Sequence, residues 1–316
     1  MRLREPRILA GRFSRAERRK RRANIILEDA SLSSATKTRY FMALQKLMPL
    51  LEKVTVDHDM DEVVCQWVEL CWKSGEPLLT VGDGLSALHF YQPWTRRRLP
   101  HSWKLFRTWR RIEIPARAPP LTQLLVRSMA SFELSNGNLE MAAMLLTSFH
   151  CLLRTGEALK MTGTDLVLGK ASGILKLRNT KTSQRFSANE AISITDPLVI
   201  DVLSTLVEIR KELRCLEAPI WRASAQLFRN RFKELIIAYG LERHQFRPYS
   251  LRRGGATHLF QTTHSMETTL TRGRWESSKV AKVYISDALS YLPNLRATKQ
   301  TKALLKKFFL VSPSIG

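Results

Sequence analysis

The most constraining feature of this sequence is an apolar stretch at residues 141–153. It is apolar nearly all round, so a helix formed here has no polar side to turn towards water and must be buried. The stretch is too short to span a bilayer, and it contains Thr147, Ser148 and His150. We therefore predict a buried helix within a globular domain.

A proline-rich segment, Ile114-Pro-Ala-Arg-Ala-Pro-Pro120, disfavours both helix and central strand. We place an interdomain linker there. The pattern before it is mostly helical, with apolar residues at helical spacing in 40–51, 61–72 and 82–89. We expect a basic flexible tail (1–22), a helical domain (23–112), the linker (113–120), a second domain (121–295) and a C-terminal helix and tail (296–316).

The second domain is predicted to be mainly α with a small antiparallel β-hairpin. Two short runs, 173–178 and 191–195, favour strands, and residues 179–190 form the loop between them. Further helices are expected at 197–213, 223–239, 251–261, 277–287 and 298–309.

The net charge indicates a polyanionic partner. Fifty-one lysines and arginines face 28 aspartates and glutamates, a formal net charge of +23. Like charges repel in a compact fold, and a bound polyanion removes that penalty. Nucleic acid is favoured over an anionic membrane surface, because no long amphipathic segment is clearly built for an interface. The basic run at 15–22 is interpreted as a nuclear import signal, an arm that contacts the DNA backbone, or a disordered tail.

The cysteine pattern predicts neither a metal site nor a disulfide framework. The spacing of Cys65, Cys71, Cys151 and Cys215 fits neither. Free thiols in a reduced compartment are expected. His150, His244 and His258 are interpreted as packing or surface residues, and no metal or cofactor is expected.

Four segments of the second domain carry candidate functional residues, and each is weak evidence alone. An arginine after a helix is often only a cap, and a lysine in a loop is normally only solvated. The segments are Arg154-Thr-Gly-Glu157-Ala-Leu, Thr180-Lys181-Thr182, Tyr249-Ser-Leu-Arg252-Arg253 with its continuation to His258, and Gly273-Arg274-Trp275 with its continuation to Tyr284.

In order and spacing these segments resemble the tyrosine recombinase, or phage-integrase-like, family. The first box of that family has an arginine followed three positions later by glutamate, as in Arg154 and Glu157. The second box is His-x-x-Arg, matched here by Arg252 but with Tyr249 at the histidine position. The resemblance covers roughly residues 121–292. It implies an integrase-like catalytic domain after a helical core-binding domain that contacts DNA, and the first half matches only in order and character.

The last box of the resemblance is the most distinctive. A histidine or tryptophan precedes the family's nucleophilic tyrosine by nine residues, as Trp275 precedes Tyr284. Gly-Arg-Trp followed by Tyr-Ile looks especially like the recombinases of eukaryotic mobile elements such as Cryptons and DIRS-like retrotransposons. The family's lysine lies in a β-hairpin between the arginine boxes. Lys181 is the best match, and Lys176 is the alternative.

Phosphodiester chemistry explains why such residue types are needed. Attack on a phosphodiester places more charge on its non-bridging oxygens, and the planar forks of Arg154 and Arg252 would hold those oxygens. Tyr284 would attack phosphorus, although a tyrosine hydroxyl with an ordinary pKa of about 10 needs activation. Lys181 would protonate the leaving 5′-oxygen. Trp275 would donate its indole N–H to a phosphate oxygen and pack the nucleophile's helix.

Several assignments keep alternatives. The alternative interpretation of Tyr284 is a half-buried tyrosine of the core. Tyr291 is the competing candidate for the nucleophile, although its spacing from Trp275 does not fit the family pattern. Arg253 is interpreted as a contact to the DNA backbone or a solvated neighbour. Arg274 and Lys279 are predicted to contact DNA.

Tyr249 departs from the family pattern. Histidine exchanges protons near neutral pH, whereas tyrosine is a poor base. We expect a slower enzyme rather than a dead one. Glu157 and Asp165 are interpreted as structural residues that orient arginines or cap turns.

The sequence therefore predicts a site-specific DNA recombinase that works through a 3′-phosphotyrosyl intermediate. The alternatives are a catalytically inactive DNA-binding protein derived from such an enzyme and a type IB topoisomerase. The expected partner is double-stranded DNA, with neither membrane nor small-molecule substrate, and the resemblance implies a homotetramer on paired sites. The nucleus is the expected location in a eukaryotic host, and the cytoplasm or nucleoid otherwise.

Overall fold

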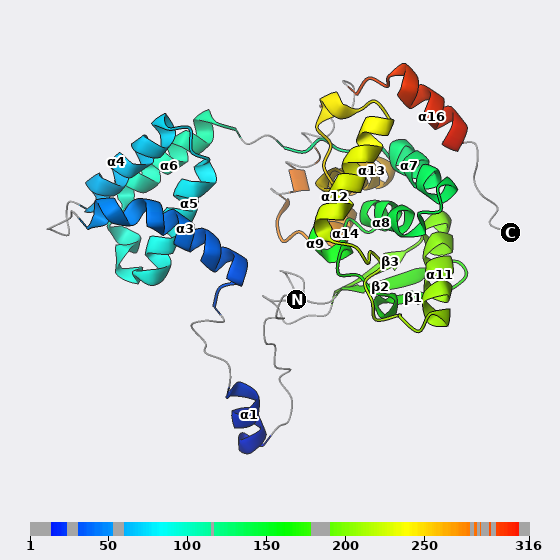
Figure 1. The fold of residues 1–316 in the computed structure, drawn as a ribbon, viewed down its shortest axis with the longest axis horizontal. Coiled ribbons are helices and arrows are strands. Elements are labelled where there is room, and N and C mark those ends of the chain that lie inside the picture. Colours follow the sequence, from blue (N-terminus) through cyan, green and yellow to red (C-terminus); the bar gives the residue numbers. More distant parts are fainter. Residues whose placement is uncertain are drawn as a thin grey trace. The chain divides into compact units, whose positions relative to one another are not determined.

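The computed structural model describes residues 14–23, 31–52, 60–114, 117–177, 190–278, 281–282, 285, 291 and 295–309. The chain divides into two compact units, Met1–Ala116 and Arg117–Gly316 (Figure 1). The finer boundaries drawn from the sequence stay a prediction. In the described part of the chain, no helix is both long enough and apolar enough to cross a bilayer.

The basic run near the N-terminus forms helix α1 (Arg15–Arg22) rather than an irregular tail. Its first turn is closed by a capping box. Ser14 Oγ accepts from the backbone N–H of Glu17, and the Glu17 carboxylate accepts from the backbone N–H of Ser14 at 2.8 Å. The capping box therefore stabilises a helix in this segment, which the run of basic residues alone did not indicate.

The first unit is a small helical bundle with its own core. Trp67 is buried at the centre, surrounded by apolar side chains from each of the main helices. The first of these begins at Ser34, six residues before the predicted start, because Ser33 caps it through the backbone N–H of Thr36. The elements are α3 (Ser34–Leu51), α4 (Met60–Lys73), α5 (Leu78–Tyr91), η2 (Pro93–Arg97) and α6 (Pro100–Ile112).

A buried carboxylate joins two helices of this bundle. Asp61, in the first turn of α4, accepts hydrogen bonds from the backbone N–H groups of His101 and Ser102 at 2.8 and 2.9 Å. Burial opposes ionisation of Asp61, but the hydrogen bonds from Ser102 and His101 prevail and hold its pKa below the ordinary value. Asp61 therefore caps the N-terminus of α6 from outside that helix.

The second unit is built around α8 (Leu139–His150), which contacts α7 (Gln123–Ser135), α11 (Pro197–Glu212) and α13 (Tyr249–Thr263) (Figure 1). Residues 141–149 of α8 are all buried, which confirms the predicted buried helix. It ends three residues earlier than expected, because Leu152 adopts a left-handed conformation with φ 48°. The remaining helices are α9 (Thr155–Ala158), α12 (Ala225–Ala238), α14 (Met266–Gly273) and α16 (Lys299–Phe309).

A three-stranded antiparallel sheet lies in the second unit, in the order β1 (Leu166–Leu168), β2 (Gly173–Leu177), β3 (Glu190–Ile194). The predicted hairpin is β2–β3, with Leu177 paired to Glu190 at the end where the two strands are connected. Side chains alternate along β2, so Leu175 is buried and Lys176 is exposed. The mainly α fold with a small antiparallel sheet is therefore confirmed, with one strand more than predicted.

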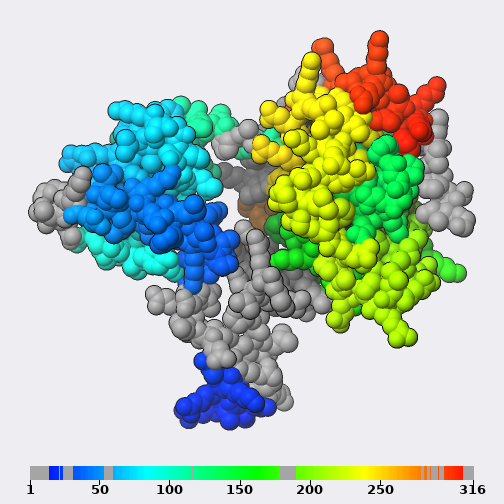
Figure 2. Space-filling view, viewed as in Figure 1, coloured from blue at the N-terminus to red at the C-terminus, as the bar shows by residue number. Residues whose placement is uncertain are grey.

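The C-terminal helix α16 packs on its own chain. It contacts α7, where the Phe308 and Phe132 rings lie 5.4 Å apart. Thr301 Oγ1 donates to the carbonyl of Tyr239 at 2.6 Å, at the end of α12. Figure 2 shows the red atoms of α16 against the green atoms of the second unit. The apolar side of this helix is therefore covered within the chain.

Candidate active site

Arg252 joins three segments of the second unit. It lies on α13 with only 1% of its surface exposed. One guanidinium nitrogen donates to the carbonyl of Leu152, and the other donates to the carbonyl of Gly273 at 2.6 Å. The guanidinium carbon lies 4.9 Å from the centroid of the Trp275 ring. The structure therefore brings together the third and fourth candidate segments and the end of α8.

The carbonyl of Leu152 is aimed by the way α8 ends. The backbone N–H of Leu153 donates to the carbonyl of Ser148 at 3.0 Å, which closes the helix around the left-handed Leu152. This conformation costs a non-glycine residue roughly 1–2 kcal/mol. It is retained where the Leu152 carbonyl accepts from both Arg252 and Arg274, the latter at 3.0 Å. The strain thus falls at a point where two cations meet.

Glu157 orients Arg154. One carboxylate oxygen accepts from the Arg154 backbone N–H at 2.8 Å, and the other from its Nη1 at 2.7 Å. Arg274 Nη2 donates to the same carboxylate at 2.8 Å. Burial raises the pKa of Glu157, but Arg274 and Arg154 prevail and lower it. The interpretation of Glu157 as an arginine-orienting residue is confirmed.

The arginine cluster carries more positive than negative charge. Burial lowers the pKa of Arg252 to about 10, and the neighbouring guanidinium groups add to that effect. Arg252 therefore stays charged at neutral pH. The described side chains of the cluster carry three positive charges and two negative ones, a surplus of one: Arg154, Arg252 and Arg274 against Glu157 and Glu190.

Buried N–H groups of the cluster lack acceptors in the described part of the chain. They are Nε of Arg252, and Nε and Nη1 of Arg274. A buried donor without a partner is costly. An anion with several acceptor oxygens satisfies such donors and neutralises the charge surplus. An anion is thus a ligand that these donors could take, and the predicted binding of a phosphate by Arg154 and Arg252 stays a prediction.

The remaining predicted residues of the third and fourth segments are also placed. Tyr249 begins α13, is partly buried, and contributes to the electrostatic environment of Arg252. Arg253 is 4% exposed, so its interpretation as a solvated neighbour is wrong. The prediction that Arg274 contacts DNA stays a prediction; its side chain is 8% exposed and ion-paired with Glu157. Trp275 lies on the face of Arg252.

Three predicted residues, Lys181, Lys279 and Tyr284, lie outside the described residues. The segment that contains Lys181 leaves the sheet at Leu177 and returns at Glu190. Glu190 Oε2 is 3.8 Å from Arg274 Nη1. One end of that segment therefore lies at the arginine cluster.

Tyr291, the competing nucleophile, is engaged elsewhere. Its hydroxyl lies 2.6 Å from Nδ1 of His244, and its ring packs against Phe246. Burial raises its pKa above the ordinary value, which disfavours the phenolate. These contacts do not support Tyr291 as the nucleophile.

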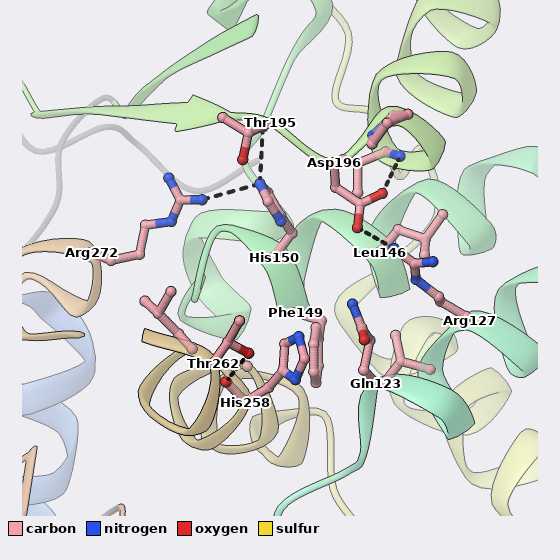
Figure 3. Close-up of a pocket in the computed structure, with 15 residues that line it drawn as sticks. Gln123, Arg127, Leu146, Phe149, His150, Thr195, Asp196, His258, Thr262 and Arg272 are labelled. Atoms are coloured by element: carbon pink, nitrogen blue, oxygen red, sulfur yellow. Dashed lines mark hydrogen bonds and ion pairs between the residues drawn. The ribbon is translucent and has the colours of Figure 1, made fainter. Parts of the chain in front are cut away.

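A cavity of about 330 Å³ opens beside the same framework, between α7, α8, α13 and the start of α11. Figure 3 shows His150 at its edge. Nε2 of His150 accepts from the backbone N–H of Thr195 at 3.2 Å and lies 3.1 Å from Arg272 Nη2. Burial, followed by the charge of Arg272, lowers the pKa of His150 to about 4. His150 is therefore a neutral packing residue, and the described residues hold no cluster of potential metal ligands.

The sequence analysis did not identify Arg272 as a residue that links two structural elements. Its Nη1 donates to the carbonyl and hydroxyl oxygens of Ser193 at 2.5 and 3.0 Å, which ties the end of α14 to β3. Arg272 and Arg274 thus hold Gly273 from two sides, and the Gly273 carbonyl accepts from Arg252. Only the local Arg-Gly-Arg pattern drew attention to this turn.

No protein-family model matches the sequence, and no curated protein matches it. Solved structures do match the fold. XerH site-specific recombinase, bound to a palindromic difH substrate, aligns with a TM-score of 0.61 and 14% identity over 87% of this chain and 81% of that one.

Two integrases match similarly. The Tn1549 transposon integrase, in complex with transposon right end DNA, aligns with a TM-score of 0.57 and 14% identity over 94% of this chain and 98% of that one. Lambda integrase, as a dimer bound to a COC′ core site, aligns with a TM-score of 0.54 and 16% identity over 83% of this chain and 92% of that one. The chain therefore has the fold of the tyrosine site-specific recombinases and integrases.

Proposed function

We propose that this chain is a site-specific DNA strand transferase that breaks and rejoins DNA through a 3′-phosphotyrosyl intermediate at Tyr284. The observation that carries the proposal is the arginine cluster, where Arg154, Arg252 and Arg274 present surplus charge and buried N–H donors. A DNA phosphodiester is an anion of the size and acceptor geometry that such donors bind. The solved neighbours, which are recombinases and integrases in complex with DNA, support the same partner.

In the proposed reaction the Tyr284 oxygen attacks phosphorus. A bond forms between that oxygen and phosphorus, and the bond from phosphorus to the 5′-oxygen breaks. Lys181 protonates the leaving 5′-oxygen, and the tyrosine proton passes to solvent or a nearby base. The reverse attack by a 5′-hydroxyl of another strand releases Tyr284 and rejoins DNA. The phosphotyrosyl bond conserves the phosphodiester's energy, so these steps balance without a co-reactant.

We propose a distinct role for each of the supporting residues. Arg154 and Arg252 hold the non-bridging oxygens, where charge accumulates during attack. Trp275 stacks on Arg252, which supports a part in orienting that guanidinium. Tyr249 stands where a histidine is usual in the resembled family, and we propose that it slows proton transfer.

We propose double-stranded DNA as the partner, with a homotetramer on two sites as the assembly. A mobile element is the proposed context, and the nucleus is the proposed location in a eukaryotic host. These features come from the resemblance and from the net charge of +23.

The test uses a library of duplexes that carry random sequences and a single nick. The nick lets the short fragment that carries the free 5′-hydroxyl diffuse away, so rejoining is prevented and the covalent intermediate is trapped. Wild type is expected to give a band that survives denaturing electrophoresis, and Tyr284→Phe is expected to give none. Salt-sensitive DNA binding without any adduct would favour the inactive DNA-binding alternative. Relaxation of supercoiled DNA without strand exchange would favour the topoisomerase.

A further inference from the structure

Arg274 is a buried cation of the arginine cluster whose described partners lie on three segments of the chain. Its side chain is 8% exposed. Nη2 donates both to Glu157 at 2.8 Å and to the carbonyl of Leu152 at 3.0 Å. Nη1 lies 3.8 Å from the carboxylate of Glu190. One guanidinium thus contacts the start of α9, the end of α8 and the first residue of β3.

The position of Arg274 is determined by the way α14 ends. Arg274 ends α14 in a left-handed conformation with φ 55°, and the backbone N–H of Trp275 closes the helix on the carbonyl of Leu270 at 3.1 Å. Leu152 ends α8 in the same way. Two helix ends therefore adopt a conformation that non-glycine residues rarely take, and they meet through the Arg274 side chain.

We propose that Arg274 is a positioning residue for strand transfer, which neutralises Glu157 and fixes the Leu152 carbonyl so that Arg154 and Arg252 can serve the phosphate. The inference rests on the proposed function. It goes beyond the expectation that Arg274 contacts DNA.

Charge balance is the first step of the argument. Glu157 holds Arg154 by accepting hydrogen bonds from its backbone N–H and its guanidinium, and Arg274 is the charge that lowers the pKa of Glu157 most. Without Arg274, two guanidinium groups would face two carboxylates, and the described cluster would lose its surplus charge. Glu157 would then be paired with Arg154 alone. The charge that develops on the phosphate during attack would meet a neutral site.

Geometry is the second step. The Leu152 carbonyl accepts from both Arg252 and Arg274, so loss of one donor frees a strained carbonyl that also locates Arg252. Arg272 holds the other side of the same turn through Ser193 and lies beside His150 (Figure 3). A displacement of Arg252 by about 1 Å can slow a reaction about 100-fold. We therefore expect a slower chemical step with DNA binding nearly unchanged.

The experiment is a double-mutant cycle on Arg274→Met and Glu157→Gln. The single-turnover rate of adduct formation is measured at saturating nicked DNA, with DNA affinity and Tm recorded for each variant. Arg274→Met is expected to react about 100-fold slower. In the double variant the unbalanced carboxylate is gone, so at least a tenfold recovery is expected. Arg274→Lys, which keeps the charge, is expected to fall between wild type and Arg274→Met.

A pH profile supplies a readout that a purely structural residue would not move. Without Arg274 the pKa of Glu157 rises. Below that pKa the carboxyl is neutral, so Arg274→Met is expected to gain rate relative to wild type as the pH falls. A double variant no faster than Arg274→Met, together with an unchanged pH profile, overturns the inference. Wild type without an adduct overturns the proposed function and the inference with it.

Discussion

Substitution of Gly255 by alanine tests how closely the site depends on one helix contact. Gly255 lies on α13, one turn after Arg252, where α13 crosses the end of α8. An added Cβ would lie 3.0 Å from the carbonyl carbon of Phe149 and closer still to its oxygen. These are backbone atoms, which cannot rotate away as the end of a side chain can. The two helices must therefore separate.

The magnitude follows from two opposed effects. Alanine in a helix interior gains about 1 kcal/mol over glycine. Overpacking in a close-packed core costs about 1–3 kcal/mol. The cost of the substitution at Gly255 is expected at the upper end of this range, because the neighbouring atoms belong to the backbone. We expect a net loss of about 2 kcal/mol in the free energy of unfolding, or about 4–8 °C in Tm. A separation of about 1 Å also moves Arg252 from the Leu152 carbonyl, which predicts a rate loss of about 100-fold.

Urea denaturation and thermal melting measure the stability change, and trapping of the covalent adduct on nicked DNA measures the rate. Gly156→Ala is the matched control, because its added Cβ meets no heavy atom within 4 Å. That variant is expected to be as stable as wild type or more stable by up to about 1 kcal/mol. Equal stability of Gly255→Ala and Gly156→Ala would refute the close approach of α13 to α8.

Three further predictions concern other groups. In the folded protein His150 has a pKa of about 4, whereas in the unfolded chain it takes up a proton near pH 6.5. The free energy of unfolding should therefore fall by up to about 3 kcal/mol as the pH falls from 6.5 to 4. Urea titrations at several pH values would measure this fall, which should be smaller in His150→Gln. Asp61→Ala should cost about 1–2 kcal/mol in the same assay, because α6 loses its cap. Tyr249→His should speed adduct formation, and an unchanged rate would contradict our account of that position.

Local patterns predicted the parts of the structure that local forces determine. The apolar stretch at 141–153 identified α8, because a helix without a polar side must be buried. The arginine-to-glutamate spacing identified the pair of Arg154 and Glu157, whose contact spans three residues. The end of α8 could not be read in the same way, because a leucine in a left-handed conformation has no distinctive sequence signal.

Contacts between distant segments were beyond the sequence. Arg274 is separated from Glu157 by 117 positions, so an exposed contact with DNA was as consistent with its neighbours as a buried ion pair. Strand β1 has three residues, too few for an alternating pattern, and exists through its pairing with β2. The amphipathic character of α16 was visible, but its position on α7 depends on tertiary contacts.

The most direct test of the central claim is to identify the DNA-linked residue by mass spectrometry. Trypsin leaves Tyr284 and Tyr291 in one peptide, between Lys282 and Arg296, so digestion before Asp287 is used to separate them. The trapped adduct is predicted to carry its nucleotide on the peptide that contains Tyr284. A nucleotide on Tyr291 or on any other residue would contradict the proposed reaction.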